Sequence, residues 1–207
     1  MTRVYYELIS RRRARVLRDH LAALIPPNAR VLDVGCGDGL LASLIMEARP
    51  DVAISGIDVL KQPHARIPVT VYNGEAIPFP DGGFDVALFV DVLHHAAAPL
   101  ALLREARRIA RARVIIKDHN RDGFAAGSIL RFMDWLGNSP YGIALPYNYW
   151  PERRWRATFA ELDLTIVDYR ARLGLYPAPI GWIFDRSLHF IALLDVRPNA
   201  LDRSLGR

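Results

Sequence analysis

The sequence predicts an α/β fold built on a Rossmann-like, doubly wound sheet, and two observations support this prediction. First, residues 31–34 form a short apolar run typical of a buried strand, glycines stand at positions 35, 37 and 39, and an apolar helical pattern begins at residue 40. Strand, glycine turn and helix open doubly wound folds, in which a nucleotide-like ligand lies over the turn. Second, seven runs of strand character occur along the chain, and helical patterns separate most of them.

The remaining elements follow from periodicity and from helix-ending residues. Apolar residues recur at helical spacing over residues 4–25, until Pro26 and Pro27 end the pattern. The nearly continuous apolar run 84–90 suits a central parallel strand that is buried on both faces. We expect strands at 30–34, 52–57, 67–72, 84–90, 114–116, 164–169 and 187–196. We expect further helices at 40–48, 99–111, 124–136 and 152–162, and a loop at 173–183.

The spacing of the glycines and the neighbouring acids indicate what kind of ligand the turn takes. A dinucleotide fingerprint has Gly or Ala where this chain has Leu40. Asp33 and Asp38 would repel a diphosphate but attract a cation. A ligand with an adenosine body and a cationic tail, S-adenosylmethionine, fits both features. The alternative is a glycine turn that only packs a helix against a strand.

The segment Asp33–Gly39 resembles the first motif of class I S-adenosylmethionine-dependent methyltransferases, and the resemblance extends over about residues 29–118. It implies a mostly parallel seven-stranded sheet with helices on both faces and an antiparallel edge strand, where the last two strands pair. It also implies S-adenosylmethionine as the cofactor and S-adenosylhomocysteine as the product. The resemblance is specific for the cofactor and weak for the substrate. In the turn it assigns cofactor contacts to Asp33, Gly35, Cys36, Gly37 and Gly39.

Further cofactor contacts are expected where later strands end. Asp58 lies 19 residues after Gly39, at the tip of the second strand, where a carboxylate can accept bonds from both ribose hydroxyls; Val59 follows it. The alternative for Asp58 is the cap of a turn. Asn73 and Gly74 stand where similar methyltransferases bind adenine, although Asn replaces the frequent Asp. Asp91 and Val92 are expected beside the methionine half of the cofactor, at the end of the central strand.

The candidate catalytic residues are His95, Asp118 and His119, which follow the fourth and fifth expected strands. An imidazole there can act as a general base or orient the substrate. The adjacent His94 is a weaker candidate, and a helix-start histidine bonded to backbone is the alternative for either ring. No metal is expected, because adjacent side chains point apart and no cysteine cluster is present.

Residues 119–150 read as an insertion on the substrate side. Its aromatic segment contains Tyr147, Asn148 and Tyr149, which in similar methyltransferases would line the acceptor pocket. Aromatic rings bury a planar or apolar acceptor, and the amide and hydroxyl groups orient it. Closure of the core by these aromatics is the alternative.

Composition limits the classes of protein and of partner. We expect one domain over residues 1–207, with residues 1–28 as a candidate lid over the cofactor. A single cysteine excludes an intrachain disulfide, and neither a transmembrane run nor a signal peptide is found in the sequence; a cytoplasmic location is therefore the expectation. The net charge of +5 permits nucleic acid, an anionic membrane surface or an acidic metabolite as partner. The arginines at 11, 12, 13, 15 and 18 read as a solvated face or as an anion-facing or membrane-facing surface.

Three functions remain open on the sequence. The favoured one is a methyltransferase that acts on a small, aromatic or lipidic molecule by in-line displacement. The second is an RNA or protein methyltransferase that docks through the arginine-rich helix. Nucleic acid is the less favoured partner, since the Asn/Asp-Pro-Pro-aromatic segment and the catalytic cysteine of such enzymes are missing. The third is a cofactor-binding module without catalysis. The oligomeric state is not predicted.

Overall fold

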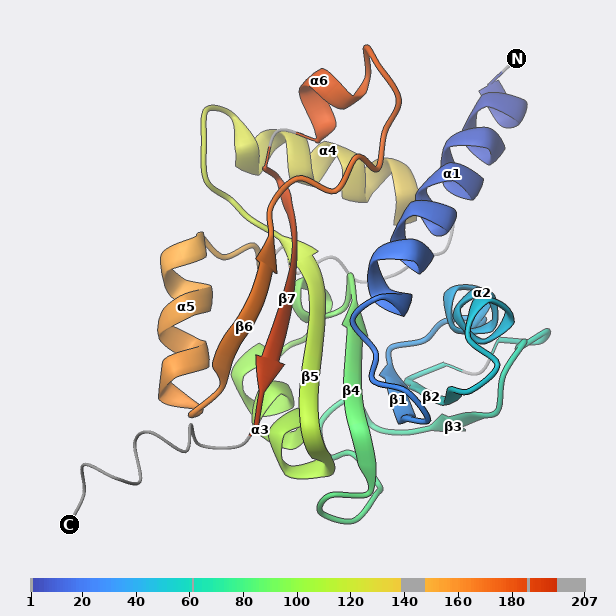
Figure 1. Ribbon diagram of the computed structural model, residues 1–207. Coiled ribbons are helices and arrows are strands. Elements are labelled where there is room, and N and C mark those ends of the chain that lie inside the picture. The colour runs from blue at the N-terminus through green and yellow to red at the C-terminus, as the bar shows by residue number, and fades with distance from the viewer. Residues whose placement is uncertain (1, 61, 139–147, 186, 197–207) are drawn as a thin grey trace.

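The computed structural model describes residues 2–60, 62–138, 148–185 and 187–196, without the side chains of residues 2–8, 134 and 136–138. Its centre is a seven-stranded sheet with the order β3-β2-β1-β4-β5-β7-β6. The strands are β1 (Arg30–Val34), β2 (Ala53–Asp58), β3 (Val69–Val71), β4 (Phe84–Val90), β5 (Ala110–His119), β6 (Thr165–Arg170) and β7 (His189–Asp195). The chain runs outward in both directions from the neighbouring strands β1 and β4, so the sheet is doubly wound as predicted (Figure 1).

All strands except β7 run parallel. β7 is antiparallel to both of its neighbours, β5 and the edge strand β6. The predicted antiparallel pair at the sheet edge is therefore confirmed, and β7 itself lies one place in from the edge. The main departure from the expected boundaries is β5, which reaches from Ala110 to His119 instead of covering 114–116. Its pairing with β7 extends to His119 and His189, so the polar end of β5 is held inside the sheet.

Helices cover both faces of this sheet (Figure 1). They are α1 (Thr2–Ala22), α2 (Leu40–Ala48), α3 (Pro99–Ile109), α4 (Ala126–Asn138), α5 (Glu152–Glu161) and α6 (Gly181–Phe184), and the 3₁₀ turn η1 (Leu93–His95) follows β4. The short helix α6 lies in the segment 173–183 and just beyond it, where a loop was expected; that part of the prediction was wrong. None of the helices in the described ranges has the length and apolar character needed to span a bilayer.

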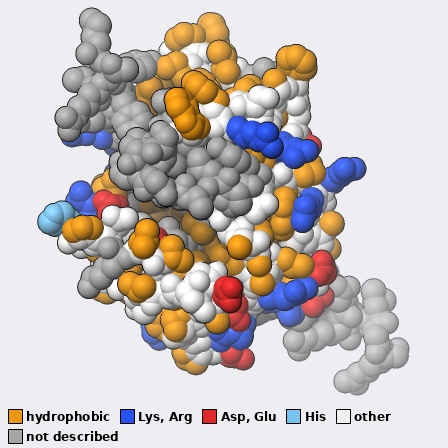
Figure 2. Space-filling model, turned by 180° about the vertical axis from the view of Figure 1, so that it is seen from behind, with side chains coloured by type: hydrophobic (Ala, Val, Ile, Leu, Met, Phe, Trp, Pro, Cys, Tyr) orange, Lys and Arg blue, Asp and Glu red, His pale blue; other side chains and the backbone are white. Residues whose placement is uncertain are grey.

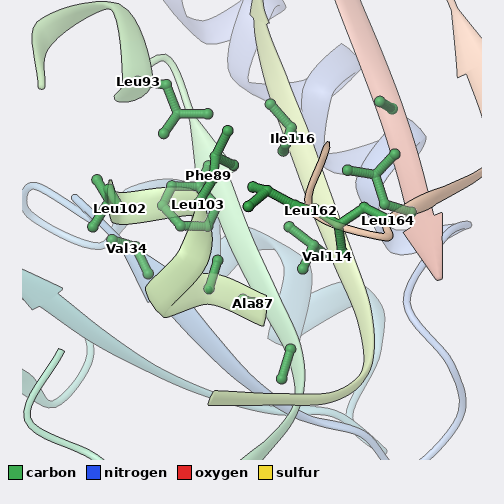
Figure 3. Packing of buried hydrophobic residues seen from close by; sticks show 14 of the residues in the cluster. Val34, Ala87, Phe89, Leu93, Leu102, Leu103, Val114, Ile116, Leu162 and Leu164 are labelled. Atoms are coloured by element: carbon green, nitrogen blue, oxygen red, sulfur yellow. The ribbon is translucent and has the colours of Figure 1, made fainter. Parts of the chain in front are cut away.

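Two apolar cores lie on opposite faces of the sheet. One packs α3 and α5 against it, and the other packs α1 and α2. β4 alternates between the two, with Ala87 and Phe89 in the first core and Val86 and Leu88 in the second. Figure 3 shows Phe89 and Ala87 beside side chains of β1, α3 and β5. β4 is thus buried on both faces, as its apolar run predicts.

The helices α4 and α6 lie beyond the carboxyl ends of the parallel strands, at the end of the molecule shown uppermost in Figure 1. The inner side of α4 forms a small third core, which consists of Ala126 and Leu130 together with Tyr149 and Leu188. This places a layer of helix over the edge of the sheet where open α/β folds bind ligands.

Candidate active site

The glycine turn between β1 and α2 has the left-handed backbone that only glycine adopts easily. Gly35, Gly37 and Gly39 have φ of 74°, 57° and 74°. A Cβ on Gly35 would lie 2.5 Å from a methyl carbon of Val92, so the turn also needs glycine for close packing against the segment after β4. The turn is further fixed because Gly35 N donates to Ile57 O over 2.7 Å. Gly35 and Val92, both predicted cofactor contacts, therefore lie side by side.

Asp58 closes this turn from β2. Its Oδ2 accepts from Gly37 N at 2.8 Å, and its Oδ1 accepts from Leu60 N at 3.1 Å. Asp33 lies beneath, buried in β1, and burial together with the charge of Asp58 raises its pKa to about 7. Burial and the same two carboxylates raise the pKa of the half-buried Cys36 thiol to about 12, which leaves it unreactive at neutral pH. The region attracts positive charge.

The loop after β3 holds Asn73 and Gly74, and here the structure adds a role that the sequence did not indicate. Asn73 Oδ1 accepts from Glu75 N at 3.0 Å and from Ala76 N at 3.1 Å, so both lone pairs of the oxygen are used in an Asx turn. Gly74 has φ of 83° and approaches Val59, which is exposed. Asn73 fixes the shape of the loop, whatever the loop binds.

Asp91 follows β4 with an unusual φ of 57° and forms the centre of a charged group. Its Oδ1 bonds to the ammonium of Lys117 at the end of β5, and its Oδ2 bonds to the guanidinium of Arg13 on α1. Lys117 is fully buried. Burial alone would raise the pKa of Asp91, but Lys117 and Arg13 hold it well below its usual range. The first helix is thus bound to the carboxyl end of the central strands by an ion pair.

A buried acid–imidazole pair lies next to this group. His94 Nδ1 is 2.7 Å from Asp118 Oδ1, and both residues are buried. Asp118 also accepts from Leu93 N at 3.1 Å and from its neighbour His119 N at 2.7 Å. Burial alone would raise the pKa of Asp118, but the His94 ring beside it brings that pKa below the usual value. Because Asp118 accepts a hydrogen bond from His94 Nδ1–H, the ring nitrogen of His94 that can act as a base is Nε2.

The contact between Asp118 and His119, both candidate catalytic residues, is secondary in this arrangement. His119 Nδ1 lies 3.4 Å from Asp118 Oδ1, a longer contact than that of His94. The predicted His95 is partly exposed, and its ring lies 4.0 Å from that of His94 between centroids. Burial and then the charge of Lys117 lower the pKa of His119 to about 4. His119 is therefore a neutral ring at physiological pH.

His189 is a further imidazole in the group, at the start of β7. Its Nδ1 lies 3.3 Å from Lys117 Nζ, and its ring centroid is 4.7 Å from that of His119. Burial and the charge of Lys117 lower the pKa of His189 well below its usual value. Its buried Nε2 has no hydrogen-bond partner in the described part of the chain.

The substrate-side residues divide between the described and undescribed parts of the chain. Tyr149 is buried, stacks on His94 at 5.3 Å between centroids, and donates its hydroxyl to Leu130 O on α4 at 3.3 Å. Asn148 is fixed by a bond from its side-chain amide to Ala96 O at 2.9 Å. Tyr147 lies outside the described residues. Tyr149 therefore forms part of the wall between the imidazoles and α4.

His94, Asp118 and His119 also offer ligand atoms that all lie within 4.8 Å of one another, a spacing that a metal ion requires. The chemistry of the site disfavours one. Asp118 already accepts three bonds, and the buried Lys117 ammonium would repel a second cation at this depth. A metal-free site stays a prediction.

The sequence did not identify three residues of the site, which are Lys117, Arg13 and His189. One signal was available for Lys117: it is one of two lysines among 27 basic residues, and it ends a strongly apolar strand. The β4–β5 register, in which Val90 faces Lys117, then brings it to Asp91. Arg13 and His189 meet the site only through tertiary packing.

The sheet order, the acid-flanked glycine turn and Asp58 at the tip of β2 together define a Rossmann-like fold of the methyltransferase class. The family model described as "Methyltransferase domain" matches residues 6–169. The chain belongs to this family and is a class I S-adenosylmethionine-dependent methyltransferase by fold and sequence.

Curated relatives and a solved structure agree with this assignment. The chain is 31% identical over 110 residues to 27-O-demethylrifamycin SV methyltransferase of Amycolatopsis mediterranei, which covers 46% of this chain and 40% of that protein. It is 28% identical over 136 residues to 2-methyl-6-phytyl-1,4-hydroquinone methyltransferase of Synechocystis sp., covering 61% of this chain and 37% of that protein. Its matches thus span about two fifths of the length of these two relatives.

The solved structure is 1,6-didemethyltoxoflavin-N1-methyltransferase of Burkholderia thailandensis, with 1,6-didemethyltoxoflavin and S-adenosylhomocysteine bound. It superimposes with a TM-score of 0.61 at 20% identity and covers 92% of this chain and 79% of that one. At that identity the likeness shows the fold alone.

Proposed function

We propose that this protein transfers a methyl group from S-adenosylmethionine to a small aromatic or lipidic molecule. The observation that supports the acceptor side most directly is the buried imidazole group at the ends of β4, β5 and β7, next to the glycine turn. A buried ring nitrogen without a partner is costly, and His189 Nε2 is such a nitrogen in the described residues. A polar group of a bound acceptor would satisfy it, while Tyr149 covers the apolar part.

The proposed cofactor site is argued from the glycine turn between β1 and α2. Asp58 would accept from the ribose hydroxyls, and the Gly35–Gly39 turn with Asp91 and Val92 would flank the methionine half. Asp33, buried beneath, favours a ligand with positive charge. Gly74 and Val59 would flank adenine in a loop that Asn73 holds in shape. S-adenosylmethionine supplies the activated methyl group, and the chain's own task is to align the acceptor and exclude water.

The cofactor is tested by calorimetric titration with S-adenosylmethionine, S-adenosylhomocysteine and NAD. We expect both sulfur ligands to bind and NAD not to bind. Asp58→Ala should weaken binding at least about tenfold, since it removes a charged acceptor. Asp51→Ala, at the opposite end of β2 and paired with Arg49, is the control and should bind normally. If neither S-adenosylmethionine nor S-adenosylhomocysteine binds, or if NAD binds in their place, the proposal is contradicted.

An acceptor that must lose a proton needs a base, and we propose the imidazole group for that role. The candidates are His94 Nε2, the ring nitrogen that does not contact Asp118, the partly exposed His95, and His119. Asp118 is a positioning residue, because it reaches the acceptor only through His94. The proposal predicts methyl transfer from labelled S-adenosylmethionine into a fraction of a metabolite extract.

Asp118→Asn separates a positioning role from a structural one. The amide has one acceptor oxygen, so it can serve Leu93 N or His119 N but not both, and it removes the charge that stabilises protonated His94. We expect kcat to drop between about tenfold and a thousandfold, with the acid limb of the pH–rate profile moved to lower pH and unchanged affinity for S-adenosylmethionine. An unchanged profile, with only thermal stability lost, would refute the role in catalysis.

Docking of RNA or protein through the arginine-rich helix is the less favoured alternative. Arg13 is turned inward to Asp91, and Arg12 lies 3.4 Å from Gly174 O, so part of the run is engaged within the chain. Activity on a small acceptor that persists after charge reversal of Arg11 and Arg15 would exclude this alternative.

A further inference from the structure

The loop that follows β3 lies where the proposed cofactor site would receive the purine base. β3 pairs with β2 so that Val71 faces Asp58, and Tyr72 N donates to Asp58 O at 3.1 Å. Gly74 then approaches Val59, since a Cβ on Gly74 would lie 3.2 Å from a methyl carbon of Val59. The residue that would hold the ribose and the loop that would hold the base are therefore adjacent.

Asn73 begins this loop, and the orientation of its side-chain amide is determined. Its Oδ1 accepts from two successive backbone amides, Glu75 N at 3.0 Å and Ala76 N at 3.1 Å. Backbone amides only donate, so the atom they contact is the oxygen and the remaining atom is Nδ2. Nδ2 donates to no group in the described part of the chain. Because Asn73 is exposed, its side chain offers a ligand N–H donors and no free lone pair.

The segment after this turn is anchored to α3. The next backbone amide, Ile77 N, donates to Glu105 Oε2 at 2.9 Å. Arg108 donates to Ile77 O at 2.9 Å and to Phe79 O at 2.8 Å, and it bonds to Glu105 Oε2 at 2.7 Å. Exchange of the oxygen and nitrogen of Asn73 would leave two backbone amides of an anchored loop without an acceptor, and an unmade bond of this kind is costly.

The acids on either side of the loop are engaged by arginines. Asp81 bonds to Arg108 at 2.8 Å, and Asp38 in the glycine turn contacts Arg66 at 3.4 Å. Figure 2 shows the molecule from behind, with acidic side chains next to basic ones over most of the described surface. Glu75 is exposed and has no ion pair within the described residues. It is therefore the acid whose contribution the experiment must separate from that of residue 73.

We propose that Asn73 makes the purine site of this chain indifferent to the 6-amino group of adenine. That group is a hydrogen-bond donor, and the amide of Asn73 presents donors, so the two form no bond. An aspartate at this position would hold the turn with one oxygen and offer the other to the amino group. Asn73 is thus a specificity-determining residue, and the inference rests on the proposed cofactor site.

The test is calorimetric titration of the whole chain with S-adenosylhomocysteine and with its 6-deamino analogue, in which purine replaces adenine and the ring nitrogens remain acceptors. We expect the two dissociation constants of the native chain to agree within about threefold. Asn73→Asp should prefer S-adenosylhomocysteine by at least about tenfold, because its free oxygen accepts from the amino group. Thr70→Asp adds the same charge at an exposed position of β3 and should keep the native ratio.

Two outcomes would overturn this inference alone. The first is a native chain that binds S-adenosylhomocysteine at least about tenfold more tightly than the analogue; loss of that preference in Glu75→Gln would then show that Glu75 recognises the amino group. The second is an Asn73→Asp variant without a preference, because residue 73 would then not face the base. If the native chain binds neither ligand, the proposed cofactor site is wrong and this inference falls with it.

Discussion

Replacement of Lys117 by Met tests whether the buried charges at the carboxyl end of β4 and β5 act as one unit. Lys117 is fully buried and bonds to Asp91 and, at 3.3 Å, to His189 Nδ1. Removing one partner of a buried ion pair costs about 3–5 kcal/mol. Asp91 keeps Arg13, and its own side chain is 19% exposed, so we expect a loss of about 2–3 kcal/mol. For a chain of this size that lowers Tm by between about 4 and 12 °C.

The assay is urea and thermal unfolding of four proteins at neutral pH. Arg113→Met is the matched control, because Arg113 lies on the same strand but forms a half-exposed pair with Asp195 at 2.7 Å; it should cost at most about 1 kcal/mol. The double variant Lys117→Met/Asp91→Asn should recover at least half of the loss, since it removes the carboxylate that has lost the Lys117 ammonium, and Asn tolerates the positive φ of residue 91. If Lys117→Met lowers the free energy of unfolding no more than Arg113→Met does, the reasoning is refuted.

The pH dependence gives a second check on the same pair. The pKa of Asp91 is held below its usual 3.8 in the folded chain, so the unfolded chain binds more protons in the window below that value. The contribution of Asp91 to stability is therefore complete above about pH 4 and is lost as the pH falls. In Lys117→Met the pKa of Asp91 in the folded chain rises toward 3.8, so the loss of folding stability on acidification should be smaller than in the native chain. An identical acid limb in both proteins would contradict this account.

Two further predictions concern the glycine turn. Gly35→Ala places a Cβ 2.5 Å from Val92 at a φ of 74°. It should destabilise the fold by about 1–3 kcal/mol and weaken the binding of S-adenosylmethionine. In the same calorimetric titration, Gly35→Ala/Val92→Ala should recover part of the affinity, and no recovery would refute the steric cause. Asp33 has a folded pKa raised to about 7 from 3.8, so the ligand-free chain loses stability as the pH rises between those values, by up to about 4 kcal/mol. Asp33→Asn should be the more stable protein at pH 8 and equal to the native chain near pH 4 in urea unfolding, and equal stability at both values would disprove the raised pKa.

The glycine turn and the strands around it could be predicted because local sequence decides them. Gly35, Gly37 and Gly39 allow a left-handed turn, and Asp58 at the next strand end follows from the chain length between two parallel strands. The contacts of Asn73 were less predictable, because whether its oxygen caps a turn or stays open for a ligand depends on how two backbone amides are placed.

The sequence by itself determined the sheet, the family-defining turn and the stretch of chain that would lie beside the ligand, because each depends on periodicity or on a residue type within a few positions. Only the tertiary structure decided that Asp118 pairs with His94 more closely than with His119, and that Lys117, Arg13 and His189 join Asp91. The contacts His94–Asp118, Lys117–Asp91, Lys117–His189 and Arg13–Asp91 span 24 to 78 positions of the chain. Their partners are chosen by strand register and helix packing, which act over distances that a local pattern does not encode.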